Sequence, residues 1–174
     1  GTSSRVISIA GESYTIGTIV QANHGIRPWL NILGKPIGKL LGEGRLMDSE
    51  SGSIIAIIAT DAPVSSLSLR QIAKRAAIGV GRGGSPGGNN SGDIFLSFST
   101  QKLSTLEKKS EIFQERLELN PDFIDPLYMA AVECVEEAVV NALVAGESVP
   151  TFKPPGLTCK SIDLEFLKGV FVDD

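Results

Sequence analysis

The sequence predicts a layered domain of the α/β or α+β class. A continuous apolar run of strand length spans residues 52–61, which is typical of a strand buried on both faces. A long helical pattern at residues 121–147 supplies a second layer. With 174 residues, 42% of them hydrophobic, the chain is long enough to bury one sizeable core. Strands and helices that each carry an apolar face pack as layers, so we expect a single layered domain.

The chain opens on a predicted β-hairpin. Apolar and β-branched residues fill the segments 5–10 and 14–23, and Gly11 lies at the turn between them. The next segment, residues 24–50, is rich in Gly and Pro and reads as a long excursion with a short helix near residues 36–44.

A helix is predicted over residues 65–81, next to the apolar run at 52–61. Ser65 or Ser66 is a suitable N-cap. Helical spacing places one group of apolar residues opposite the basic ones; the group comprises Leu69, Ile72, Ala76 and Ala77. After a glycine-rich loop, residues 93–100 alternate between apolar and polar and predict a strand.

The helix predicted within residues 121–147 is the clearest element of the second half. Pro126 suits its first turn and Gly146 ends it. Its buried stripe comprises Leu127, Ala131, Val135, Ala138, Val139, Ala142 and Leu143. Residues 111–119 fit a strand or a helix equally well, and residues 164–172 form a short apolar run.

Composition excludes several classes of protein. The net charge is −4 and no basic stripe or RNA-binding motif is present, so we expect no nucleic-acid partner. No apolar run reaches the roughly 18 residues that a membrane span needs. The cysteines, Cys134 and Cys159, form no metal or disulfide pattern and favour a reducing, cytoplasmic compartment. Because His24 is the one histidine, most zinc sites are excluded, and a Ser-His-Asp triad is possible only with His24 as its base.

The loop GRGGSPGGNNSGD, residues 81–93, admits three interpretations. Glycine N–H groups can cradle a phosphate, but the loop lacks the GK[ST] signature and precedes a strand where a phosphate loop precedes a helix. The loop also fits a flexible surface linker. In the third interpretation, the Ser91 hydroxyl attacks the carbonyl carbon of Asn90.

That attack is an N→O acyl shift, and hydrolysis of the resulting ester leaves Ser91 as a new N-terminus. Glycines on both sides permit the unusual backbone geometry. A freed Ser91 would carry its own base, because an α-amine has a pKa near 7.7–8.0 and lies within reach of the hydroxyl of the same residue. Such a nucleophile needs no histidine.

Several segments together resemble the L-aminopeptidase/D-esterase family, which also contains β-peptidyl aminopeptidases and a nylon-oligomer hydrolase. The similarity covers most of residues 1–147. Its most specific block is GNNSGDIF at residues 88–95, and the other matching segments are GTSSRVI, YTIGTIVQANHGIRPWL, GSIIAIIATDAP and VEEAVVNALVAGE.

The resemblance implies an αββα sandwich that is similar to N-terminal-nucleophile hydrolases but differs in connectivity. It implies self-cleavage between Asn90 and Ser91 into an α portion, residues 1–90, and a β chain, residues 91–174, and assembly of several αβ units. Ser91 is then nucleophile and general base, and the oxyanion-hole asparagine corresponds to Asn23. No metal or organic cofactor is implied.

The family also places a Ser-x-Glu or Asp-x-Asp pair near the nucleophile, and the local match is Cys134 and Glu136. Residues two apart on a helix lie roughly 200° apart, so both cannot face one point. Cys134 also fits the apolar stripe, and Glu136 fits a solvated face. We assign Asp48 and Glu50 to a solvated turn with no catalytic role.

The predicted function is therefore a self-processing serine aminopeptidase or amidase. Its substrates would be small peptides, amides or esters. The alternative is an uncleaved, inactive relative that serves as a ligand-binding or assembly subunit. Family members have further residues ahead of the segment that matches Gly1, and these contribute to the pocket, so we expect this chain to be part of a larger protein or to share its pocket with another chain.

Overall fold

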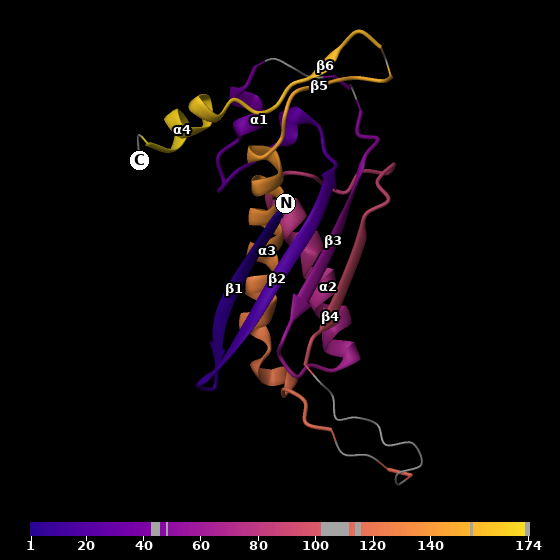
Figure 1. Ribbon diagram of the computed structural model, residues 1–174, viewed down its shortest axis with the longest axis vertical. Coiled ribbons are helices and arrows are strands. Elements are labelled where there is room, and N and C mark those ends of the chain that lie inside the picture. Colours follow the sequence, from indigo (N-terminus) through magenta and orange to yellow (C-terminus); the bar gives the residue numbers. More distant parts are fainter. Residues whose placement is uncertain (43–45, 48, 102–111, 114–115, 154, 173–174) are drawn as a thin grey trace.

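A four-stranded sheet in the order β1-β2-β3-β4 organises the chain (Figure 1). The computed structural model describes all residues except 43–45, 48, 102–111, 114–115, 154 and 173–174. The strands are β1 (Thr2–Ile9), β2 (Glu12–Asn23), β3 (Ser53–Thr60) and β4 (Ile94–Ser99). β1 and β3 are antiparallel to β2, whereas β3 and β4 are parallel. The predicted hairpin is confirmed, and Ala10 and Gly11 take up positive φ angles at its turn.

Two long helices pack on the same face of this sheet, α2 (Ser66–Arg82) and α3 (Asp125–Val144) (Figure 1). The Ser65 side chain caps α2 by accepting the N–H of Ser68 at 3.1 Å, which confirms one of the two predicted caps. The helices approach closely at Gly79, where an added Cβ would lie 2.8 Å from Cβ of Val135.

The core lies between the sheet and these helices. Ile16 of β2, Ile54 and Ile58 of β3, and Ile72 of α2 are completely buried there. Most of the predicted α3 stripe is buried as well, whereas Ala77 of α2 is exposed, because the helix turns that residue away from the sheet. The α+β class is confirmed.

The opposite face of the sheet is left open by the described residues. Ile55 of β3 is 39% exposed and Leu96 of β4 is 53% exposed, although both belong to apolar strands. The expectation that the run at 52–61 is buried on both faces is therefore wrong for this chain, because both long helices cover the same face. In the described residues, one helical layer covers one four-stranded sheet, which corresponds to half of an αββα sandwich.

The remaining elements gather beyond the end of the sheet where β2 finishes (Figure 1). They are η1 (Arg27–Trp29), α1 (Ile37–Leu40), β5 (Val149–Pro150), β6 (Thr158–Cys159) and α4 (Leu164–Val172), while η2 (Pro121–Phe123) leads into α3. A second small core joins α1 to α4 through Ile37 and Leu167.

The segment at 111–119 extends into residues outside the described range at 111 and 114–115. Its described residues, 112–113 and 116–119, form neither helix nor strand.

Candidate active site around Ser91

Ser91 lies three residues before β4, in a half-buried position. Its Oγ donates a hydrogen bond to Oδ1 of Asp93 at 2.5 Å. Its backbone N–H donates to the carbonyl of Gly88 at 2.8 Å, which closes a tight turn with Asn89 and Asn90 at its exposed tip. The peptide bond between Asn90 and Ser91 therefore leaves a turn and enters the short segment that leads into β4.

The residues after Ser91 are tied to the start of β3. The Gly92 N–H donates to Oγ of Ser53 at 2.8 Å, and the Ile54 N–H donates to Oδ1 of Asp93 at 3.0 Å. These two bonds extend the β3–β4 pairing toward the loop. Ser91 is consequently held beside a regular strand although the loop before it is rich in glycine.

Asn23 ends β2 and pairs with Ser53 of β3, the residue whose Oγ holds Gly92. Gly52 allows this approach, because an added Cβ there would lie 1.9 Å from the Asn23 carbonyl oxygen. Asn23 and Ser91 thus lie at the same end of the sheet, on either side of the Ser53 position. Asn23 is exposed and lines a cavity of about 430 Å³.

That cavity lies between the segment after β2 and the C-terminal end of α3. Its apolar lining includes Ile26, Leu30 and Leu143, and its charged lining residues are Arg27, Glu147 and Lys160. A second hollow, of about 400 Å³, opens beside Asp93 and the loop around Pro86. One cavity thus adjoins Asn23 and the other adjoins Asp93.

Glu50 is a site residue that sequence reasoning missed. It is 6% exposed, and its carboxylate accepts hydrogen bonds from the Gly25 N–H at 2.5 Å, the Ser85 hydroxyl at 3.2 Å and the Gly88 N–H at 3.0 Å. The expectation of a solvated turn is wrong for Glu50, because its carboxylate is bonded to three protein donors in place of water, while Asp48 lies outside the described residues. Neither spacing nor hydrophobicity signals such a role.

His24 stands beside this cluster. Its Nδ1 is buried and has no hydrogen-bond partner among the described residues. Burial lowers the pKa of His24 from the ordinary 6.5, and the negative charges of Asp93 and Glu50 oppose that shift. A neutral imidazole is therefore favoured at the end of β2.

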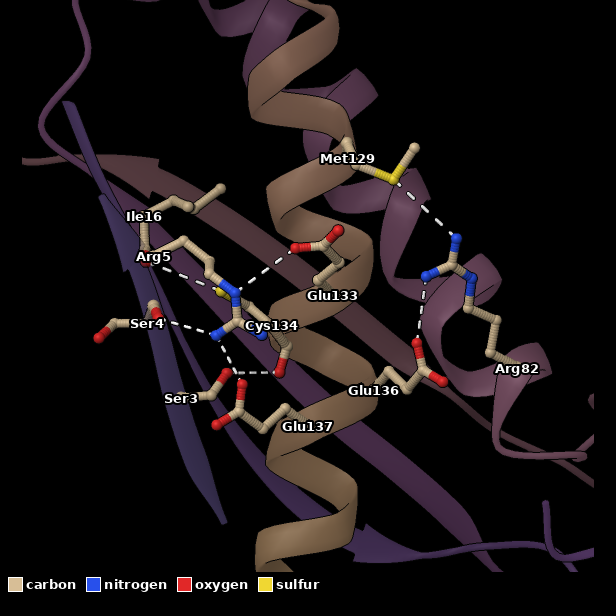
Figure 2. A network of polar contacts seen from close by, with 10 residues as sticks. All are labelled: Ser3, Ser4, Arg5, Ile16, Arg82, Met129, Glu133, Cys134, Glu136 and Glu137. Carbon is tan, nitrogen blue, oxygen red and sulfur yellow. Dashed lines mark hydrogen bonds and ion pairs between the residues drawn. The ribbon is translucent and has the colours of Figure 1, made fainter. Parts of the chain in front are cut away.

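The structure places Cys134 and Glu136 in the packing of α3 (Figure 2). Cys134 is fully buried against β2, its thiol directed at the Ile16 carbonyl at 3.8 Å. Glu136 forms an ion pair with Arg82 of α2 at 3.1 Å. The two side chains point to different neighbours, as the 200° offset requires.

Other contacts around Cys134 tie α3 to β1. Ser3 donates to the Cys134 carbonyl at 2.6 Å, and Arg5 forms ion pairs with Glu133 and Glu137 (Figure 2). Among the described residues, no hydrogen bond or ion pair joins Cys134 or Glu136 to Ser91. The contacts that the structure shows join Cys134 to β2 and Glu136 to Arg82 of α2.

Among the described residues, no group of three or more His, Cys, Asp or Glu side chains is arranged to hold a metal ion. None of the described helices combines the length and apolar character that crossing a membrane requires.

The fold is a variant of the N-terminal-nucleophile hydrolase fold. The structure superimposes with a TM-score of 0.88 on the L-aminopeptidase D-Ala-esterase/amidase of Ochrobactrum anthropi. That protein is described as a prototype of the serine aminopeptidases and as a new variant of the N-terminal-nucleophile hydrolase fold. The two chains are 44% identical, and the match covers 99% of this chain and 47% of the other. A Burkholderia β-aminopeptidase matches with a TM-score of 0.80 at 36% identity, over 98% of this chain and 49% of that one.

The chain belongs to peptidase family S58, whose model matches residues 1–154. It is 38% identical over 164 residues to the β-peptidyl aminopeptidase BapA of Sphingosinicella microcystinivorans. That match covers 86% of this chain and 41% of the relative. The chain thus spans somewhat less than half the length of the proteins that it resembles.

Proposed function

We propose that the protein containing this chain is a peptidase that cleaves itself between Asn90 and Ser91 and then uses Ser91 as an N-terminal nucleophile. The observation that carries this proposal is the placement of Ser91. Its hydroxyl contacts a carboxylate, and its peptide bond joins an exposed turn to a segment that is hydrogen-bonded to β3. Membership of peptidase family S58 supports hydrolysis of peptide bonds.

After cleavage, the Ser91 α-amine takes the proton of its own hydroxyl while Oγ attacks the substrate carbonyl carbon. The Asn23 side-chain amide donates to the oxyanion, an interaction for which loss of a single donor costs roughly 2.7–4 kcal/mol in other enzymes. The amine then passes the proton to the leaving group. Water hydrolyses the acyl-enzyme and restores Ser91.

The substrates we propose are small peptides, amides or esters from which an N-terminal residue is released. The relatives are an L-aminopeptidase with D-Ala-esterase/amidase activity and β-aminopeptidases, so L-, D- and β-residues are the classes to assay. The cavity beside Asn23, about 430 Å³ with a partly apolar lining, has a size suited to small substrates.

The two products of the cut would stay together. β3 precedes the cut and β4 follows it, yet they pair over six residue positions, Ile55↔Ile94 to Thr60↔Ser99. α2 and α3 also belong to different products and pack closely. Opposite charge adds to this, because residues 1–90 carry nine basic and five acidic side chains, whereas residues 91–174 carry seven and fifteen.

N-terminal sequencing and intact mass of the purified protein test the proposal. We expect a second N-terminus that reads SGDIF. Ser91→Ala should abolish both the cleavage and peptidase activity. A wild-type chain that stays intact on long incubation would contradict self-cleavage and favour an uncleaved binding or assembly subunit. Amidase activity that survives in Ser91→Ala would contradict the assigned nucleophile.

A further inference from the structure

Self-cleavage poses a proton problem that the mature enzyme does not have. Before the cut, the nitrogen of Ser91 belongs to a peptide bond, and resonance withdraws its lone pair into the carbonyl group. The α-amine that serves as base in the mature enzyme therefore does not yet exist. Some other group must accept the Ser91 hydroxyl proton when Oγ attacks the Asn90 carbonyl carbon.

The structure of the uncleaved chain shows one group in contact with that proton. Among the described residues, Oδ1 of Asp93 is the hydrogen-bond partner of Ser91 Oγ, at 2.5 Å. An O–H to carboxylate bond of this length is charge-assisted and short. The same oxygen accepts the Ile54 N–H at 3.0 Å, so β3 fixes the carboxylate where the hydroxyl meets it.

The neighbouring titratable groups are less well placed. Both carboxylate oxygens of Glu50 are occupied by donors from Gly25, Ser85 and Gly88. His24 makes no hydrogen bond to Ser91 in the described part of the chain, and its Nδ1 is enclosed. Geometry therefore selects Asp93.

We propose that Asp93 is the catalytic base of self-cleavage; this inference rests on the proposed function. Oγ of Ser91 forms a bond to the Asn90 carbonyl carbon while its proton passes to the Asp93 carboxylate. The protonated Asp93 then gives that proton to the Ser91 nitrogen as the C–N bond breaks, which leaves an ester and a free α-amine. Water hydrolyses the ester to the Asn90 carboxylate and the Ser91 hydroxyl, and Asp93 ends as it began.

Asp93→Asn is the direct test, because an amide oxygen still accepts from Ile54 N–H and from Ser91 Oγ but is too weakly basic to take the proton. General base catalysis typically contributes 10²–10⁴-fold, so we expect the new N-terminus, which reads SGNIF in this variant, to appear more slowly by about that factor. Asp93→Glu keeps a carboxylate and should cleave faster than Asp93→Asn. Equal rates in Asp93→Asn and the wild type would overturn the inference and leave the proposed function standing.

A matched control lies at the other end of the sheet. Oδ1 of Asp61, just after β3, accepts the Thr15 N–H at 2.7 Å, so Asp61→Asn makes the same change to a strand-anchoring aspartate far along β3 from Ser91. We expect Asp61→Asn to cleave at the wild-type rate. Slowing as large as that of Asp93→Asn would show that lost strand anchoring, and not a lost base, is responsible.

Hydroxylamine assigns the step, because it cleaves esters but not ordinary peptide bonds. If Asp93 is needed to form the ester, added hydroxylamine leaves Asp93→Asn uncut. Restoration of cleavage by hydroxylamine would place Asp93 in ester hydrolysis instead and would contradict the inference. If the wild type itself stays uncut under all conditions, the proposed function fails first, and that result is distinguishable from every outcome above.

Discussion

Oε2 of Glu50 accepts the backbone N–H of Gly88 at 3.0 Å, three residues before Ser91. A buried carboxylate from the excursion after β2 thereby holds the loop that leads to the proposed cut. Gly88 is suited to this contact because an added Cβ would lie 2.5 Å from the same oxygen. The carbonyl of Gly88 in turn accepts the Ser91 N–H, so Gly88 connects Glu50 to Ser91, the proposed nucleophile.

Replacing Glu50 with alanine should destabilise the fold and slow self-cleavage. The change leaves the Gly25 and Gly88 N–H groups and the Ser85 hydroxyl without their acceptor, and each buried unpaired group costs about 1–3 kcal/mol. Urea unfolding of a cleavage-blocked Ser91→Ala background measures the stability, and the SGDIF terminus reports the rate. The exposed Glu165, paired with Lys168, is a matched control whose alanine variant should change neither. An unchanged free energy of unfolding in Glu50→Ala would contradict a stabilising role for these hydrogen bonds to Glu50.

Asn23→Ala should lower kcat of the cleaved enzyme by about 10²–10³-fold, because one donor to the oxyanion is removed. Gln21, two residues earlier on the same face of β2, provides the control, and Gln21→Ala should leave kcat unchanged. Steady-state kinetics on a small amide substrate measures both. A rise in KM with unchanged kcat in Asn23→Ala would mean that Asn23 binds the substrate and does not stabilise the oxyanion.

Cys134 should resist thiol reagents in the folded protein, whereas Cys159 should react. Cys134 is fully buried, and burial raises the pKa of its thiol, so little thiolate is available. Cys159 is exposed. Mass spectrometry after alkylation should show one label in the native state and two in urea. Rapid labelling of Cys134 in the native state would contradict its burial in the core. The variant Cys159→Ser leaves Cys134 as the sole cysteine and so identifies which residue carries the label.

Stability should decline as the pH falls below 6.5, in part through His24. Burial lowers the pKa of His24 in the folded state, so the unfolded chain binds the proton more readily. The contribution of His24 is therefore present above the unfolded pKa and is lost as the pH falls through the folded value. Urea midpoints of the wild type and of His24→Gln across this range provide the measurement. Identical pH profiles for the two proteins would show that His24 makes no such contribution.

Local chemistry predicted most of the helices and strands. Residues 52–61 become β3, Ser65 caps α2, and Pro126 lies in the first turn of α3. In each case the signal is carried by neighbouring residues whose backbone preferences and side-chain periodicity agree. The open face of β3 escaped prediction, because an apolar run does not reveal on which side of a sheet the helices pack.

The candidate site likewise contains one residue that the local sequence indicated and another that only contacts between distant segments reveal. Ser91 stood out because its loop and strand are continuous in sequence. Glu50 lies 41 positions away from Ser91 in the chain and acts through backbone donors, which carry no side-chain signature. Cys134 and Glu136 matched a local pattern, yet the helix directs one at β2 and the other at Arg82. Which side chains meet is decided by packing between distant segments.

The pairing of β3 with β4 implies that the proposed cleavage takes place after the sheet has folded. The Asp93 oxygen that accepts the Ser91 hydroxyl also accepts the N–H of Ile54 in β3, 39 residues earlier in the chain, so the assembled sheet holds the proposed base in place. An unfolded chain lacks this anchor, so we expect the proposed cut to be much slower there than in the folded chain. A cleaved molecule would therefore be one whose sheet has assembled. We expect the fraction of chains with an SGDIF terminus to report the fraction that has folded.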